Sequence, residues 1–303
     1  MKNSLLKRSV ALFTLAFILF SAGCSCSSRT GKKELVVFKD AVFEKLIKEE
    51  LKKDTVYTDD LSDVSGIQIL ADKFIFLSGS GRPERDIILY GDDAFEYEEQ
   101  KYTGFGTIKT LEDLKNFPAL NALKVFLQPE IDYSTIPSME KLTQLTISQS
   151  KLKDIAFLSN AVNIVSLSLS TNNISDISPL GGCTKLTFLS VDFNDVSYIT
   201  ALSKLSQLKR ISFYSNQISD LSPIKDLKSL ENIALYDNKI KDIGALSGLT
   251  NLKKLELINN EIEDVSPLKD FASFEELRLS GNPIKNLEVL KHIENLEYKR
   301  VYP

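Results

Sequence analysis

Apolar residues return every 22 positions through the last two thirds of this 303-residue chain. The series runs without insertion or deletion through Leu120, Leu142, Ile164, Leu186, Leu208, Leu230, Leu252, Phe274 and Leu296. Within the eight units between 120 and 295, the spacing L-x-x-L-x-L-x-x-N-x-L recurs. A unit this short cannot bury its apolar face alone, so it is stable only when neighbouring units stack on it. The period therefore predicts one elongated coil of repeats.

Each unit is expected to open with a short strand, as around Ile211 to Phe213. Side chains alternate in direction along a strand, so Ile211 and Phe213 point into the coil and Ser212 points out. The strands of successive units then stack into a parallel sheet. The other apolar positions of the unit turn the chain back and fill the same core.

An asparagine column follows the predicted strands. Its members are Asn172, Asn194, Asn216, Asn238, Asn260 and Asn282. Asparagine carries donors and an acceptor, so each is expected to satisfy backbone groups of its own coil and the next. The first two units have Gln128 and Ser150 in this column, and their turns are expected to be less regular.

A second polar column is acidic and comprises Asp154, Asp176, Asp220, Asp242 and Asp264. Each aspartate is expected to start a turn. Where Ser-Pro follows, the serine is expected to cap a short helical or 3₁₀ segment, with the proline in its first turn. A ladder of bound cations is the less favoured interpretation of this column.

The stretch Leu230 to Leu249 resembles the 22-residue class of leucine-rich repeats, and most of all bacterial internalin-type repeats. The resemblance covers about 120–300. It implies an α/β fold: a right-handed leucine-rich repeat solenoid with a parallel concave sheet and short 3₁₀ or turn segments on the convex side. Such a concave face commonly binds a protein. The resemblance carries over no catalytic residue.

Residues 1–23 are expected to be a signal peptide, because basic residues precede an apolar run from Val10 to Ala22 that is short for a membrane span. Ser-Ala-Gly before Cys24 resembles the lipobox of bacterial lipoproteins, which implies that Cys24 becomes the lipidated first residue. Ser21 departs from that pattern, where leucine is commoner. This leaves ordinary cleavage or use of Cys26 as alternatives. The protein is then expected in the bacterial cell envelope, lipid-anchored and extracytoplasmic, on the outer membrane of a diderm.

Three further segments complete the predicted organisation. Residues 24–33 form a tether. Residues 34–105 form an N-terminal cap with a helix from Asp40 to Lys53, and Val36 to Leu70 resembles the helical cap before many bacterial leucine-rich repeats. Residues 106–303 form the solenoid, whose ninth strand is expected at Leu296 and Tyr298. In the cap, strands are expected at Ile67–Leu77 and Asp86–Tyr90 around a turn at 78–83.

Charge and residue usage narrow the function. Three of the 37 basic residues precede residue 24, which leaves 34 against 41 acidic residues, a net of −7. This argues against nucleic acid and leaves the lipid anchor as the membrane contact. The only histidine, His292, is predicted to point outward, and Cys183 is predicted to lie in the core. We expect no enzyme, cofactor, metal or disulfide, although a carboxylate-only hydrolase stays open.

A candidate binding site lies on the outward positions of the sheet. Aromatic and apolar residues there fall in four adjacent units, and aromatic anchors usually dominate protein interfaces. Charged residues, with Glu256 and Arg278 among them, are expected to form a rim. The predicted site is Phe188, Asp192, Phe193, Arg210, Tyr214, Tyr236, Asp237, Lys254 and Ile258.

The sequence thus predicts a monomeric surface protein that binds a protein or peptide on its concave face. The alternative is a carbohydrate-binding or structural envelope protein, because aromatic platforms also stack on sugars. A third possibility places recognition in the hairpin at 66–100. Scattered exposed aromatic residues without function would be the simplest alternative for the patch itself.

Overall fold

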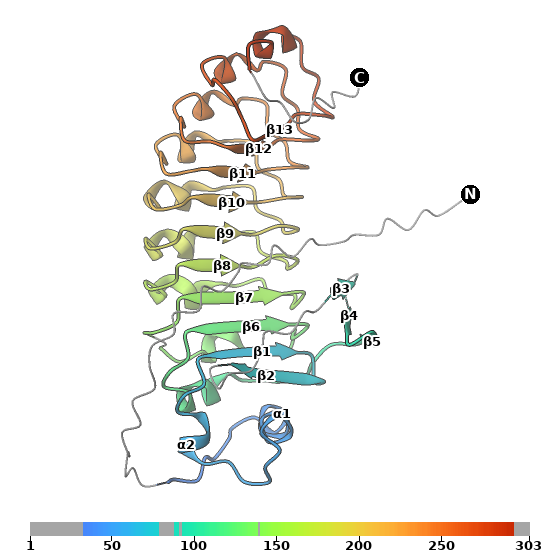
Figure 1. Ribbon diagram of the computed structural model, residues 1–303, viewed down its shortest axis with the longest axis vertical. Coiled ribbons are helices and arrows are strands. Elements are labelled where there is room, and N and C mark those ends of the chain that lie inside the picture. The colour runs from blue at the N-terminus through green and yellow to red at the C-terminus, as the bar shows by residue number, and fades with distance from the viewer. Residues whose placement is uncertain (1–32, 79–87, 91–92, 139, 294–303) are drawn as a thin grey trace, which may run out of the picture.

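A computed structural model describes residues 33–78, 88–90, 93–138 and 140–293. Figure 1 shows one elongated, curved coil, with strands stacked along its length and the two α-helices at its N-terminal end. The predicted signal peptide, the lipidation site at Cys24 and the ninth strand at Leu296 and Tyr298 all lie outside the described residues.

A ten-stranded sheet runs along the coil in the order β13-β12-β11-β10-β9-β8-β7-β6-β1-β2. All neighbours are parallel except β1 and β2. The strands are β1 Gly66–Leu70, β2 Phe74–Ser78, β6 Ala122–Phe126, β7 Gln144–Ser148, β8 Ser166–Ser168, β9 Phe188–Ser190, β10 Arg210–Ser212, β11 Asn232–Ala234, β12 Lys254–Glu256 and β13 Glu276–Arg278. Strands β7 to β13 pair with residues 22 apart, which confirms the predicted register.

Short 3₁₀ helices form the opposite side of each coil. They are Glu112–Asn116, Tyr133–Thr135, Ala156–Asn160, Ser178–Gly182, Thr200–Lys204, Ser222–Ile224, Gly244–Leu246, Ser266–Leu268 and Leu287–Leu290. Because a helical turn needs more width than the about 4.8 Å between neighbouring strands, this side takes the outside of the curve. The parallel sheet and these helices confirm the predicted leucine-rich repeat solenoid.

The core consists of the apolar columns, which are buried from coil to coil. Ile211 and Phe213 are 2% and 0% exposed, as the alternation along the strand predicts. Cys183 is fully buried in the same core, and its thiol donates to the Leu158 carbonyl at 3.5 Å. Burial raises the pKa of the Cys183 thiol to about 11.

The asparagine column closes each turn onto the preceding coil. Asn194 Nδ2 donates to the Leu169 and Val191 carbonyls, and its Oδ1 accepts from the Ile174 backbone at 2.9 Å. The prediction that these side chains satisfy backbone groups is confirmed. The expected direction was wrong, because the cross-coil partners lie 20 and 25 residues earlier and not in the next coil.

A left-handed residue precedes every position of this column. Its backbone N–H donates to the neighbouring coil, as from Phe193 to the Tyr214 carbonyl at 2.7 Å. These residues are Leu127, Gln149, Thr171, Phe193, Ser215, Asp237, Asn259 and Gly281, with φ between 48° and 74°. Bulky or β-branched residues rarely adopt this conformation, so the stacked coils impose it. Near Gln128 and Ser150, the extra left-handed residue Lys151 (φ 51°) gives the irregularity that was expected.

The aspartate column starts the 3₁₀ helices, as predicted. Asp176 Oδ1 accepts from the Ser178 backbone at 2.8 Å, and Oδ2 accepts from the Ser178 hydroxyl. The prediction that the serine is the cap was wrong. Ser178 is the first helical residue, and the carboxylate two positions earlier accepts from its N–H.

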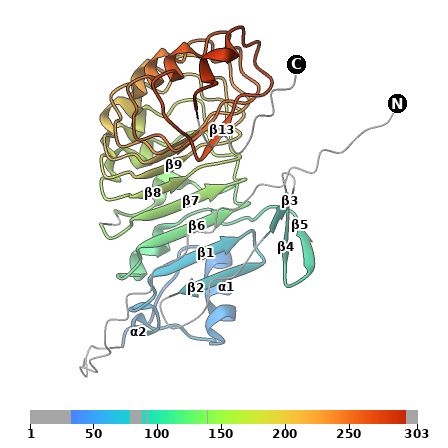
Figure 2. The same ribbon diagram turned by 45° about the horizontal axis from the view of Figure 1, so that its top comes forward.

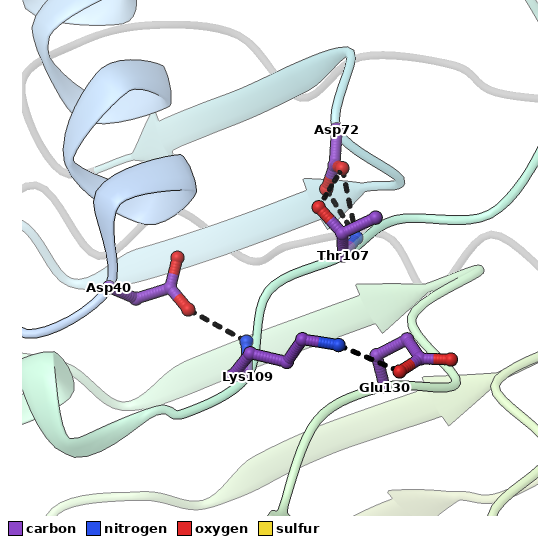
Figure 3. Close-up of polar contacts among 5 residues, drawn as sticks. All are labelled: Asp40, Asp72, Thr107, Lys109 and Glu130. Carbon is purple, nitrogen blue, oxygen red and sulfur yellow. Dashed lines mark hydrogen bonds and ion pairs between the residues drawn. The ribbon is translucent and has the colours of Figure 1, made fainter.

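The N-terminal cap contains α1 (Ala41–Leu51) and α2 (Thr58–Leu61). The expected helix from Asp40 is confirmed. Asp40 Oδ1 accepts from the first turn of α1, and Oδ2 accepts from the Lys109 backbone at 2.7 Å (Figure 3). Nearby, Asp72 accepts from the Thr107 backbone and hydroxyl, and Lys109 pairs with Glu130 at 2.7 Å. Carboxylates thus join the cap to the first coil.

The predicted strands of the cap need correction. Ile67–Leu77 is not one strand: β1 and β2 form a hairpin that turns at Ala71, where φ is 45°. The expected partner strand, β3 (Ile88–Tyr90), pairs instead with β4 (Ala94–Tyr97). Together with β5 (Gln100–Thr103) they form a separate sheet.

This small sheet lies beside the carboxyl ends of β1 and β6 (Figures 1 and 2). Phe74 contacts Phe95, Tyr97 and Tyr102, with ring centroids 5.1–6.2 Å apart. These aromatic rings cover the outward side of β2. Of the β2 residues, Ile75 and Leu77 face the solenoid core instead. The run Ile67–Leu77 therefore has two apolar faces, which hides its turn from sequence patterning.

A candidate partner-binding face

The predicted site residues lie in rows across the solvent-facing side of strands β9 to β13, on the concave side of the coil. We call this side of the sheet the outer face. The first row contains Phe188, Arg210, Asn232, Lys254 and Glu276, directly opposite one another in register. The second contains Ser190, Ser212, Ala234, Glu256 and Arg278. The third contains Asp192, Tyr214, Tyr236 and Ile258, and the left-handed column with Phe193 and Asp237 follows it.

Two tyrosines form the centre of the outer face. The Tyr214 and Tyr236 rings meet edge to face, with centroids 5.9 Å apart. The Tyr214 hydroxyl donates to Glu256 Oε2 at 2.9 Å, and Asn259 Nδ2 donates to the Tyr236 hydroxyl at 3.2 Å. Both rings are only partly buried. They are therefore held in place before any partner arrives, which reduces the entropy lost on binding.

A charged network extends from Tyr214 toward the C-terminal coils. Arg278 pairs with Glu276 and lies 3.5 Å from Glu256, and Lys254 lies 3.6 Å from Glu276. Burial, followed by the Glu256 charge, raises the pKa of Tyr214. The hydroxyl therefore stays protonated and donates to Glu256. The sequence places Glu276 in the same outward column as Lys254, but the predicted rim did not include it, although it joins the two cations.

Asp192 was predicted as part of the charged rim, but its carboxylate is engaged within the protein. It accepts from the Ser212 hydroxyl at 2.6 Å, the Tyr214 backbone at 2.8 Å and the Ser190 hydroxyl at 2.9 Å. Burial raises the pKa of Asp192. Its lone pairs support the backbone under Tyr214, so we assign it a positioning role.

Continued toward the N-terminus in steps of 22 residues, the third row reaches Ser170, Ser148 and Phe126, where the face is closed. Phe126 belongs to the aromatic cluster under the small sheet, and Ser148 and Ser170 are each 7% exposed. The Ser148 hydroxyl donates to the Ser170 carbonyl at 2.7 Å. The open part of this row therefore begins near β9, where the predicted aromatic residues begin.

Among the described residues, no group of three or more His, Cys, Asp or Glu is arranged to hold a metal ion. His292 is exposed on the last described coil. Within the same described part of the chain, no helix combines the length and apolarity that a membrane crossing requires.

The chain was compared with known proteins. The family model described as leucine rich repeats (2 copies) matches residues 206–248, 228–270 and 250–292. The structure of internalin C2 from Listeria monocytogenes is 27% identical, with a TM-score of 0.60, over 82% of this chain and 92% of that chain. An internalin encoded by inlF in the same organism is 26% identical, with a TM-score of 0.57, over 86% and 88%. No curated protein matches the chain.

The matched repeats coincide with the coils that carry the tyrosine pair and the charged network. The repeats and these structures together support an internalin-like leucine-rich repeat protein.

Proposed function

We propose that this protein is a surface-displayed, lipid-anchored receptor-like module that binds a protein or peptide on the outer face, without chemical turnover. An internalin-like leucine-rich repeat fold supports protein binding in general. The observation that carries the proposal is the Tyr214–Tyr236 pair, partly exposed and fixed by Glu256 and Asn259. Fixed aromatic rings surrounded by a rim of charged residues are typical of the energetic centre of a protein interface.

The predicted residues divide into two roles in this proposal. Those that meet the partner are Phe188, Phe193, Arg210, Tyr214, Tyr236, Asp237, Lys254 and Ile258. Asp192 holds the strand beneath them. The partner is a protein or peptide, and the protein acts as a monomer. The small sheet β3–β5 limits the accessible length of the face at the N-terminal end.

The test is a cross-linking pull-down with the soluble protein from Lys32 onward, using envelope extract and host-cell extract. The bait is compared with its Tyr214→Ala, Tyr236→Ala variant. Loss of two central anchors is expected to weaken capture by at least about 30-fold, since a hot-spot residue contributes about 2 kcal/mol or more. Equal capture by both proteins would refute the outer face as the site.

Tyr198→Ala is the matched control. Tyr198 is 81% exposed and precedes the 3₁₀ helix Thr200–Lys204, so it lies away from the outer face. Its removal deletes an exposed tyrosine of the same size and is expected to leave capture unchanged. If Tyr198→Ala and the double variant lose the same prey, the binding is nonspecific adhesion to tyrosine.

The anchor is tested separately, at the terminus. Metabolic labelling with an alkyne fatty acid is expected to mark the wild-type protein and the Cys26→Ala variant but not Cys24→Ala. Label lost only in Cys26→Ala would move the lipidation site, and label on none would favour ordinary signal cleavage.

A carbohydrate ligand is the alternative. Partly exposed tyrosine rings also stack on sugars, and Tyr214 and Tyr236 are such rings. A glycan array distinguishes the two: binding that the Tyr214→Ala, Tyr236→Ala variant loses would favour a sugar over a peptide.

A further inference from the structure

Arg210 differs from the other cations of the outer face because it has no ion-pair partner among the described residues. It is exposed at the start of β10, and no described residue forms an ion pair or hydrogen bond with its guanidinium. Lys254 and Arg278, by contrast, are held by Glu276 and Glu256. Four of the six charges on the first three rows of the face therefore neutralise one another.

Glu231, an acid whose pKa the Arg210 charge also lowers, is already paired. Glu231 Oε2 pairs with Lys253 Nζ at 2.6 Å, and this contact is the main cause of the lowered pKa of Glu231. Lys209 beside Arg210 has no ion pair with a described residue either. An excess of positive charge therefore gathers at the start of β10, although the chain as a whole carries −4.

Apolar surface surrounds this positive charge on two sides. Phe188 lies directly opposite Arg210 on β9, about 5 Å away across the sheet. Tyr214 lies four residues further along the same chain, about 13 Å away in extended backbone. The face thus offers one unpaired guanidinium between two aromatic surfaces, at a spacing of about four residues of an extended peptide.

Resting on the proposed function, we propose that Arg210 binds a carboxylate in an acidic segment of the partner protein. An apolar residue next to that carboxylate packs on Phe188, and an apolar residue about four positions away packs on Tyr214 and Tyr236. The guanidinium is suited to this because it donates two parallel N–H bonds to one carboxylate. The paired cations Lys254 and Arg278 add little attraction, since their acids already screen them.

The test uses a displayed library of random 12-residue peptides, selected on the soluble protein at low salt. Peptides retained by wild-type protein are expected to be enriched in Asp or Glu, with an aromatic or aliphatic residue about four positions away. Arg210→Ala is expected to weaken their binding about 10-fold to 100-fold, the range of a charge-assisted hydrogen bond. Selection on Arg210→Glu should replace the acidic preference with Lys or Arg.

Arg278→Ala is the matched control, because its guanidinium is already bound to Glu256 and Glu276. It should retain the acidic preference. Equal melting temperatures would establish that all variants fold. Selected peptides without acidic enrichment, or no retained peptide, would overturn the inference.

The inference and the proposed function fail in different ways. Peptides lost by Tyr214→Ala, Tyr236→Ala but unaffected by Arg210→Ala would refute the carboxylate site and keep the outer face. Peptides unaffected by both sets of changes would refute both.

Discussion

Removal of the Asn172 side chain tests the physical basis of the solenoid. Asn172 Oδ1 accepts from the Ser150 and Leu152 backbone N–H groups at 3.0 and 3.2 Å, and no other described group accepts from either donor. Both donors are buried, and Ser150 is 1% exposed. Asn172→Ala therefore leaves two buried donors unsatisfied. At about 1–3 kcal/mol each, the free energy of unfolding should fall by about 4 kcal/mol.

The next residue provides the control. Asn173 is exposed, and no hydrogen bond of its side chain to a described residue is recorded. Asn173→Ala makes the same chemical change one position away and should alter stability by less than about 0.5 kcal/mol. Asn172→Asp keeps the acceptor but places an oxygen 2.8 Å from the Ile147 carbonyl. It should therefore be at least as destabilising as Asn172→Ala.

Guanidinium chloride unfolding followed by far-UV circular dichroism measures these changes, since the chain has no tryptophan. With a slope of about 4–6 kcal/mol per molar, the midpoint of Asn172→Ala should fall by about 0.7–1 M. If the free energies of unfolding of Asn172→Ala and Asn173→Ala differed by less than about 0.5 kcal/mol, the reasoning would be refuted. An Asn172→Asp variant as stable as wild type would refute it as well.

Three further predictions follow from buried groups. Because burial raises the folded-state pKa of Asp192 above 3.8, its ionised form destabilises the protein at neutral pH. The stability of wild type relative to Asp192→Asn should increase as pH falls from 7 toward 3.8 in urea unfolding, and a constant difference would contradict this. Native Cys183, with a pKa of about 11, should resist iodoacetamide at pH 8 and react once denatured; rapid native labelling would disprove its burial. Asp40→Ala should lower the free energy of unfolding by about 2–3 kcal/mol and speed hydrogen exchange in α1, because the first turn of α1 and the Lys109 backbone lose their acceptor. The control Asp54→Ala, at an exposed position, should change neither quantity.

Much of the outer face could be predicted because the 22-residue period determines which residues are neighbours on it. Residues 22 apart are neighbours in stacked coils, so the row from Phe188 through Arg210 to Lys254 follows from spacing alone. The same arithmetic places Arg278 beside Glu256. It does not indicate which acid a given cation selects, because that depends on side-chain conformation.

Two features could not be read from the repeat. The Tyr214–Glu256 hydrogen bond joins residues 42 apart, across two coils, so it depends on the side-chain orientation of Tyr214 and not on the 22-residue spacing alone. Asp192 occupies a predicted rim position, yet three donors enclose its carboxylate. In both cases the partner is set by the curvature and packing of the stacked coils.

The sequence by itself determined the solenoid, the register of its strands and the identity of its turn-closing asparagines. These features depend on a strict 22-residue period, which places the same residue type in the same local environment in each coil. Only the tertiary structure decided the hairpin within Ile67–Leu77, the small sheet β3–β5 and the isolation of Arg210. These features occur once, and each depends on packing between segments that no repeat relates: β4 and β5 cover the Phe74 side of β2, and Arg210 forms no ion pair with a described residue, while Glu231 pairs with Lys253.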